Sequence, residues 1–218
     1  MSTPYNITEG HHVFTLGQVQ GNTIHYNFDQ VWIYLQHKGQ LLFGKRFKLH
    51  ETDREIILKL CCYYIQDQEF CHAHNIDLKK GILLSGPEGC GKASLMKLLR
   101  HVILKPKLYK VVHSRNIVFQ FNQTGTKAIE AYGNRYAYCF LGLGLEPQGK
   151  FYSNNCNVMR EIIYSRHDLF LKTGIKTYGT TQLNALEIES NYGTRVRSMM
   201  RQLFNLMTFS THSKNKYT

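Results

Sequence analysis

Short apolar runs alternate with amphipathic stretches along most of the chain. The apolar runs have the length of buried strands and cover residues 80–85, 109–113, 135–143, 176–181 and 205–209. Between them, apolar positions recur at helical spacing over residues 93–102, 115–121, 125–132, 154–172 and 184–203, the last with a break near Tyr192-Gly193. Strands that alternate with helices predict a parallel sheet with helices on both faces.

The chain before the first of these strands has a different pattern. Residues 1–27 are polar with weak periodicity, and a short helix is expected over 28–36. Thr52 and Glu55 have the spacing of a capping box. Apolar residues then recur at helical intervals and predict a helix over 52–72, namely Ile56, Ile57, Leu60, Cys61 and Tyr64.

Length and composition fit one α/β domain with a modest N-terminal addition. The chain has 218 residues, 43% of them hydrophobic and 19% charged. We divide it into an N-terminal helical accessory region, 1–75, and an α/β domain, 76–218. It has no apolar run of about 18 residues, and residues 1–5 lack the order of a secretory signal. We therefore expect a cytoplasmic protein without a membrane partner.

The charge balance is strongly basic. Formal net charge is +12, and the lysines and arginines are spread along the chain. An excess of this size favours a polyanionic partner, of which nucleic acid is the commonest, so DNA is the expected partner. A basic surface with no such partner is the alternative.

The turn after the first strand carries a phosphate-binding motif. It reads Gly86, Pro87, Glu88, Gly89, Cys90, Gly91 and Lys92, which matches G-x-x-x-x-G-K between a predicted strand and a predicted helix. Glycines let backbone amides point at phosphate oxygens, and Lys92 can reach the β and γ phosphates. We expect ATP or ADP to bind at this loop and the two residues after it, Ala93 and Ser94.

The residue after Lys92 departs from the motif. A Ser or Thr normally stands there because its hydroxyl binds Mg²⁺, whereas this chain has Ala93, whose methyl group cannot bind a metal. Ser94 lies one helical step on, rotated by about 100°. We therefore do not expect a standard Mg²⁺ site.

Three stretches resemble the DnaC/IstB group of AAA+ ATPases: Ile76–Leu84, the phosphate loop and Tyr192–Val196. The resemblance covers about residues 50–210. This resemblance implies a three-layer P-loop NTPase fold of the AAA+/ASCE type, with about five parallel strands in the order 5-1-4-3-2. It also implies self-association, DNA, and a replicative helicase or transposase-like partner. The chain stops soon after its last strand, so the C-terminal helical lid common in AAA+ proteins is expected to be absent.

Several positions that carry chemistry in this family are replaced. Aligned on the family's Asp-Asp-Leu-Gly motif, the two acids become Leu141 and Gly142, while Glu146 persists beyond the strand tip, where we expect a structural or interface role. The polar sensor residue becomes Gln182, which is longer than Asn by one methylene. At the position of the trans-acting arginine stands Met199. Neither an aliphatic side chain nor a glycine can hold Mg²⁺ or activate water.

These replacements fall on the chemistry and spare the scaffold. We therefore expect an AAA+-type protein that binds ATP or ADP weakly, binds DNA or a DNA-processing partner, and is deficient in hydrolysis. Two alternatives stay open: an active DNA-dependent ATPase with non-standard catalytic residues, and a DNA-binding or assembly module that needs no nucleotide.

Other candidate groups carry weaker signals. Cys71, His72 and His74 lack the two-Cys spacing of a zinc site, so core cysteines and surface histidines are expected. Cys90 could be activated within the loop, but a filler role is preferred. Tyrosines beside lysines, as at Tyr217, could stack on bases.

Overall fold

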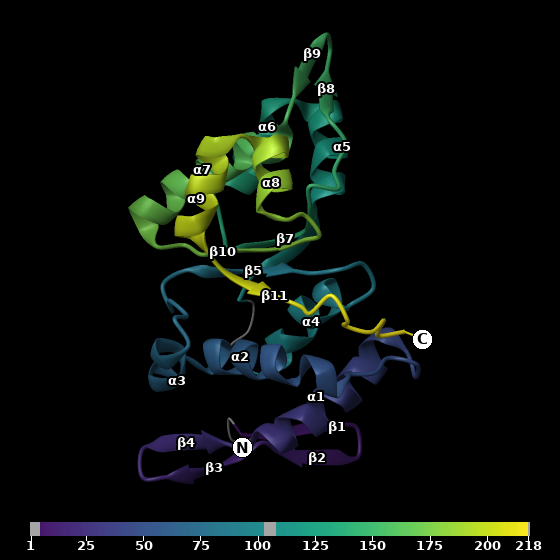
Figure 1. Cartoon of the computed structure of the whole chain (residues 1–218), viewed down its shortest axis with the longest axis vertical. Helices are drawn as coiled ribbons and strands as arrows, with labels where there is room; N and C mark the ends of the chain where they lie inside the picture. The colour runs from purple at the N-terminus through teal and green to yellow at the C-terminus, as the bar shows by residue number, and fades with distance from the viewer. Residues whose placement is uncertain (1–4, 103–107, 218) are drawn as a thin grey trace.

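A parallel sheet of five strands lies across the middle of the molecule (Figure 1). The structure is a computed structural model that describes residues 5–102 and 108–217. The strands are β5 (Gly81–Ser85), β6 (Lys110–His113), β7 (Tyr138–Leu143), β10 (Thr177–Thr181) and β11 (Phe204–Thr208). They lie in the order β11-β5-β10-β7-β6 with parallel pairing throughout. This order confirms the predicted 5-1-4-3-2 sheet.

Helices cover both faces of this sheet (Figure 1). One face carries α1 (Phe28–Phe43), α2 (Arg54–Ile65), α3 (Gln68–Ala73) and α4 (Lys92–Leu98). The other carries α5 (Ser114–Thr124), α6 (Thr126–Gly133), α7 (Val158–Thr173), α8 (Ala185–Tyr192) and α9 (Thr194–Leu203). The molecule is therefore the predicted three-layer α/β sandwich.

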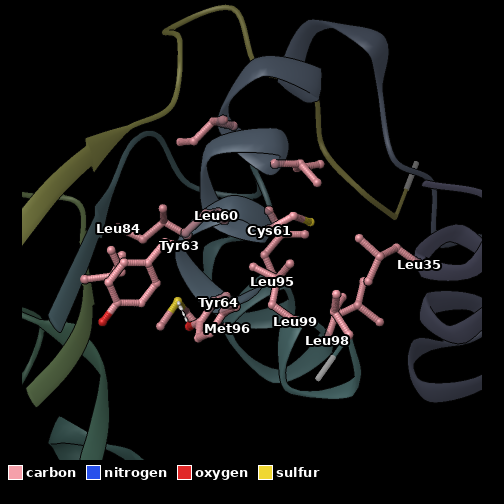
Figure 2. Close-up of a cluster of buried hydrophobic side chains, with 14 of the residues drawn as sticks. Leu35, Leu60, Cys61, Tyr63, Tyr64, Leu84, Leu95, Met96, Leu98 and Leu99 are labelled. Atoms are coloured by element: carbon pink, nitrogen blue, oxygen red, sulfur yellow. Dashed lines mark hydrogen bonds between the residues drawn. The ribbon is translucent and has the colours of Figure 1, made fainter. Parts of the chain in front are cut away.

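The helix that follows the phosphate loop is held by a dense apolar cluster (Figure 2). Leu95 of α4 is fully buried, as are Leu60 of α2 and Leu35 of α1. The Tyr64 hydroxyl of α2 donates a hydrogen bond to the Met96 sulfur of α4, at 3.9 Å. Burying one such leucine contributes about 1.5–3 kcal/mol, so this cluster holds α4 firmly against α1 and α2. It thereby fixes the loop that precedes α4.

The first part of the N-terminal region is not helical, which corrects the expectation that residues 1–75 form a helical region. It forms two antiparallel hairpins, from β1 (Asn6–Glu9) with β2 (His12–Thr15) and β3 (Gly17–Gln20) with β4 (Thr23–Tyr26). Gly10 and Gly21 make the turns with φ of 59° and 61°, and Gly21-Asn22 is a hairpin signal that weak periodicity concealed. Residues 1–4, part of the segment judged not to be a secretory signal, lie outside the described residues.

The predicted helix over 52–72 is divided, and its capping box does not form. A 3₁₀ turn, Glu51–Asp53, precedes α2, and Gln66 ends α2 in the left-handed conformation with φ of 65°. The Asp53 side chain makes no capping bond and pairs instead with Lys216, far along the chain. The buried positions predicted for this helix are confirmed, including Leu60 and Tyr64.

The helix expected over 28–36 extends to Phe43 as α1, and two further elements begin later than the sequence predicts. The segment 154–172 begins with a strand, because β8 (Gly149–Phe151) pairs with β9 (Asn154–Cys156) before Asn157 caps α7. The strand expected from residue 135 begins at Tyr138, because the carbonyls of Arg135 and Tyr136 accept hydrogen bonds from Arg166 instead. Both differences come from contacts between distant parts of the chain.

The N-terminal region and the sheet share one core. Ile7, Leu16 and Val31 belong to the same buried cluster as Leu95 and Met96 of α4. The N-terminal hairpins and α1 are therefore packed against the layer that carries the phosphate loop. Among the described helices, none is both long and apolar enough to cross a membrane.

Candidate functional site

The phosphate loop connects the buried strand β5 to α4, as the motif predicts. Gly89 and Gly91 have φ of 77° and 90°, a backbone conformation that side-chain-bearing residues rarely adopt. Lys92 is the first residue of α4 and is 8% exposed. The sequence pattern of glycines thus corresponds to a real conformational requirement of the loop.

The Lys92 ammonium lies inside its own loop. Its Nζ donates to the carbonyl oxygens of Gly86 and Pro87, each at 2.7 Å, and contacts the Cys90 sulfur at 3.7 Å. Cys90 is fully buried, and burial raises the pKa of its thiol despite the nearby Lys92 ammonium. Cys90 is therefore a buried filler of the loop rather than an activated thiol.

A cavity of about 330 Å³ opens beside the loop. Its walls come from the loop and α4, from the carboxyl ends of β6, β7 and β10, and from one C-terminal side chain. The lining residues are Glu88, Gly89, Gly91, Lys92, Ala93, Ser94, His113, Leu141, Gly142, Leu145, Thr180, Thr181, Gln182 and Tyr217. The carboxyl ends of parallel strands are the usual place for a ligand in an open α/β sheet. The cavity is therefore the candidate nucleotide site.

The structure brings together most of the residues predicted for this site. The loop residues from Glu88 on line the cavity except Cys90, which lies beneath the surface, while Gly86 and Pro87 supply the carbonyls that hold Lys92. Three of the replaced positions, Leu141, Gly142 and Gln182, stand on the opposite wall. These three positions therefore lie at the candidate nucleotide site, where the family resemblance puts their counterparts.

The residues at this wall do not fit a Mg²⁺ ion bound beside the phosphates. Leu141 presents an aliphatic side chain and is 2% exposed, and the Gly142 amide already donates to Thr180 Oγ1 at 2.9 Å. Ala93, which stands where the motif has a Ser or Thr hydroxyl, offers only a methyl group. Among the described lining residues, Glu88 is the one carboxylate, and it is exposed on the loop. Mg²⁺ prefers several oxygen ligands in octahedral geometry, which this wall does not supply.

Glu146 supports the end of β7 instead of lining the cavity. Its carboxylate accepts hydrogen bonds from the Gly144 amide, at 2.8 Å, and from the Tyr192 hydroxyl of α8. Burial raises the pKa of this carboxyl above its usual range. The contacts tie the loop after β7 to α8, which agrees with the structural role expected from sequence.

The position expected for a trans-acting arginine lies away from the cavity. Met199 is 9% exposed on α9 and is not among the lining residues. Nearby, Arg197 pairs with Glu189, and the Arg195 guanidinium lies over the Tyr164 ring at 5.4 Å. None of these arginines reaches the cavity of its own chain within the described residues.

The six cysteines are free thiols, and within residues 5–102 and 108–217 no three His, Cys, Asp or Glu side chains are grouped to hold a metal ion. Burial raises the pKa of the Cys61 and Cys139 thiols well above their usual range. His74 stacks on Phe70 at 3.9 Å between ring centroids. Cys71 is buried, whereas His72 and His74 are exposed, as expected for a core cysteine and surface histidines.

Sequence reasoning missed the C-terminal contribution to the site. Tyr217 lines the cavity, and Lys216 lies against the loop. The one sequence signal was the pairing of lysine with tyrosine at the end of the chain, which we read as a candidate for base stacking. No local pattern indicates that this segment folds back on a loop more than 120 residues away.

The sheet order, the loop between β5 and α4, and the cavity define an AAA+-type P-loop NTPase fold. No protein-family model matches the chain, and no curated protein matches it. Solved structures do. The crystal structure of the DnaC helicase loader is 17% identical, with a TM-score of 0.53 over 74% of this chain and 92% of that one.

Two other solved structures show the same fold. A putative primosome component from Streptococcus pyogenes serotype M3 is 15% identical, with a TM-score of 0.53, over 78% of this chain and 86% of that one. The DnaI structure is 16% identical, with a TM-score of 0.51, over 75% and 88%. The chain therefore has the DnaC-like AAA+ fold that the sequence resemblance implied.

Proposed function

We propose that this chain is a helicase-loader-like AAA+ protein that binds ATP or ADP in the loop cavity but does not hydrolyse ATP efficiently. One observation carries the proposal: an intact phosphate loop faces a wall on which Leu141 and Gly142 replace the expected acids. The loop amides and Lys92 suit a polyphosphate. On the opposite wall Leu141 and Gly142 stand where the family has the acids that hold Mg²⁺ and activate water, so we expect binding without efficient turnover.

Nucleotide binding at this loop requires Lys92 to exchange partners. Its ammonium is satisfied by the Gly86 and Pro87 carbonyls, and a phosphate must draw it away from them. A charge-assisted bond to phosphate replaces two bonds to neutral carbonyls, so the net gain is modest. We therefore expect weak binding, with little contribution from Mg²⁺.

Calorimetric titration with ATP and with ADP tests this proposal. The dissociation constant is expected to differ by less than about threefold between EDTA and Mg²⁺, and Lys92→Ala is expected to weaken binding by about tenfold or more, equivalent to about 1.4 kcal/mol. Lys97→Ala, on the same helix but outside the cavity lining, is the matched control. Tightening of tenfold or more by Mg²⁺ would contradict the account.

We further propose that the chain acts on DNA or on a DNA-processing partner, such as a replicative helicase. The net charge of +12 supports a polyanionic partner, and the structures with this fold include a helicase loader and a putative primosome component. The same charge fits a nucleotide-independent assembly module. Such a module would bind DNA equally with the Lys92→Ala variant and without nucleotide.

Fluorescence anisotropy with single-stranded and duplex DNA measures this second part. Binding is expected to weaken by about tenfold or more between 50 and 200 mM salt, because counterions are released when lysines and arginines neutralise phosphates. Absence of binding at 50 mM salt would remove DNA as the direct partner and leave a protein partner.

A further inference from the structure

The segment after β11, residues 210–217, folds back across the phosphate loop. In Figure 1 it runs from β11 past α4 toward α1. The Lys216 amide donates to the Gly89 carbonyl at 3.3 Å, and the Lys48 amide donates to the Lys216 carbonyl at 2.9 Å. His50 Nε2 lies 3.0 Å from the Asn215 carbonyl. The 210–217 segment thus joins the loop to the stretch of chain before α2.

The loop glycines are in direct contact with this segment. A Cβ placed on Gly91 would lie 2.5 Å from Lys216 Cγ, and one on Gly89 would lie 3.2 Å from the Asn215 side chain. Side chains occupy these two approaches to the loop. The absence of a Cβ at Gly89 and Gly91 therefore permits close packing of the 210–217 segment, in addition to the loop conformation.

Buried polar groups anchor the segment. Lys216 and Asp53 form an ion pair in which both side chains are 0% exposed, and the Ser213 hydroxyl donates to Asp53 Oδ1 at 2.7 Å. Breaking one side of such a pair while it stays buried costs several kcal/mol. The ion pair therefore separates only when the segment undocks and both charges reach water.

The last described residue of the segment enters the cavity itself. The Tyr217 hydroxyl shares a hydrogen bond with Ser94 Oγ, and the Tyr217 ring packs against Phe47, with 5.9 Å between centroids. The Ser94 hydroxyl, one of the predicted nucleotide contacts, is thus already occupied. Tyr217 forms one wall of the cavity.

We infer that the 210–217 segment is a built-in competitor of nucleotide: ATP or ADP binds at the loop when the segment undocks. This inference rests on the proposed function of the same cavity. A nucleotide in the loop needs the Ser94 side of the cavity and the surface of Gly89 and Gly91, which the segment covers. The apparent affinity is lowered by the fraction of molecules in which the segment is docked.

Release of the segment in the full chain tests the inference. The double variant Lys216→Ala with Tyr217→Ala removes both anchors, and Asp53 becomes solvated when the segment leaves. Affinity for ADP in EDTA is expected to rise about tenfold or more relative to the parent chain, and amide exchange of residues 86–91 to accelerate. Lys214→Ala, an exposed lysine in the same segment, is the matched control and is expected to change neither quantity.

If the double variant does not fold, Tyr217→Ala alone tests the inference. The Tyr217 side chain is 40% exposed, and its loss leaves the Lys216–Asp53 pair intact. It is expected to raise ADP affinity about threefold. Addition of ADP to the parent chain is expected to accelerate amide exchange across residues 211–217. This second measurement needs no substitution.

The outcomes separate the two proposals. Equal ADP affinity in the parent and released chains, or slower exchange of residues 211–217 with ADP, overturns the competitor and leaves nucleotide binding in place. Absence of ADP binding at millimolar concentration in the parent and released chains overturns the proposed function, and the competitor with it. Tighter binding that Lys92→Ala abolishes supports both.

Discussion

Replacing Arg166 with alanine is expected to lower the free energy of unfolding by about 3–5 kcal/mol. Arg166 of α7 is fully buried, and burial lowers the pKa of its guanidinium to about 10, so it keeps its charge at neutral pH. It donates to Thr177 Oγ1 at 2.9 Å and to the carbonyls of Arg135, Tyr136 and Lys176 at 2.8–3.0 Å. Alanine would remove four hydrogen bonds, three of them to backbone carbonyls, and leave a cavity between α7 and the sheet.

Chemical denaturation of the folded chain measures this effect. Arg160→Ala, on the same helix but exposed, is the matched control and is expected to change stability by no more than about 0.5 kcal/mol. A loss below about 1 kcal/mol for Arg166→Ala would show that water or relaxed backbone satisfies the carbonyls. The Arg166 network would then not explain why β7 begins at Tyr138.

Restoring the missing groups is expected to convert the cavity into an ATPase site. The triple variant Ala93→Thr, Leu141→Asp and Gly142→Asp is expected to raise Mg²⁺-dependent ATP turnover by about 10²-fold or more over the parent chain. All three positions line the cavity. A Cβ on Gly142 would meet only Leu145 side-chain atoms, at 3.5 and 3.9 Å, so there is space for a side chain, but the φ of 74° means that an aspartate there carries backbone strain.

The triple variant has an internal control. Gly142→Asp alone supplies one acid without the second acid or the hydroxyl, and is expected to leave turnover at the parent level. Turnover that stays at background in the triple variant, with nucleotide still bound, would show that the changes at Gln182 and Met199 limit the reaction more than the missing acids do. Phosphate release at several Mg²⁺ concentrations distinguishes these results.

The sheet could be predicted from sequence because its signals are local. β5 is a run of five buried residues that leads into the loop, and the period of apolar residues over α2 matches its buried face. The glycines at 89 and 91 predicted a loop that needs positive φ, and the structure has it. The strand order came from the family resemblance, not from periodicity.

The features that sequence missed depend on contacts between distant residues. The capping-box spacing of Thr52 and Glu55 predicts a helix start, yet the residue between them, Asp53, pairs with Lys216, 163 positions along the chain. Arg166 delays the start of β7 by taking the carbonyls of residues 135 and 136. The N-terminal hairpins are four-residue strands, too short for a period of two to stand out. None of these partners could be chosen from spacing alone.

The proposed function requires that the cavity hold ATP without cleaving it. The most direct test incubates the parent chain with a limiting amount of ATP, Mg²⁺ and DNA, separates protein-bound nucleotide, and identifies it by chromatography. The account predicts bound nucleotide recovered as intact ATP, with release of phosphate no faster than in the Lys92→Ala variant. Recovery of the bound nucleotide mainly as ADP, with turnover above that variant, would contradict it.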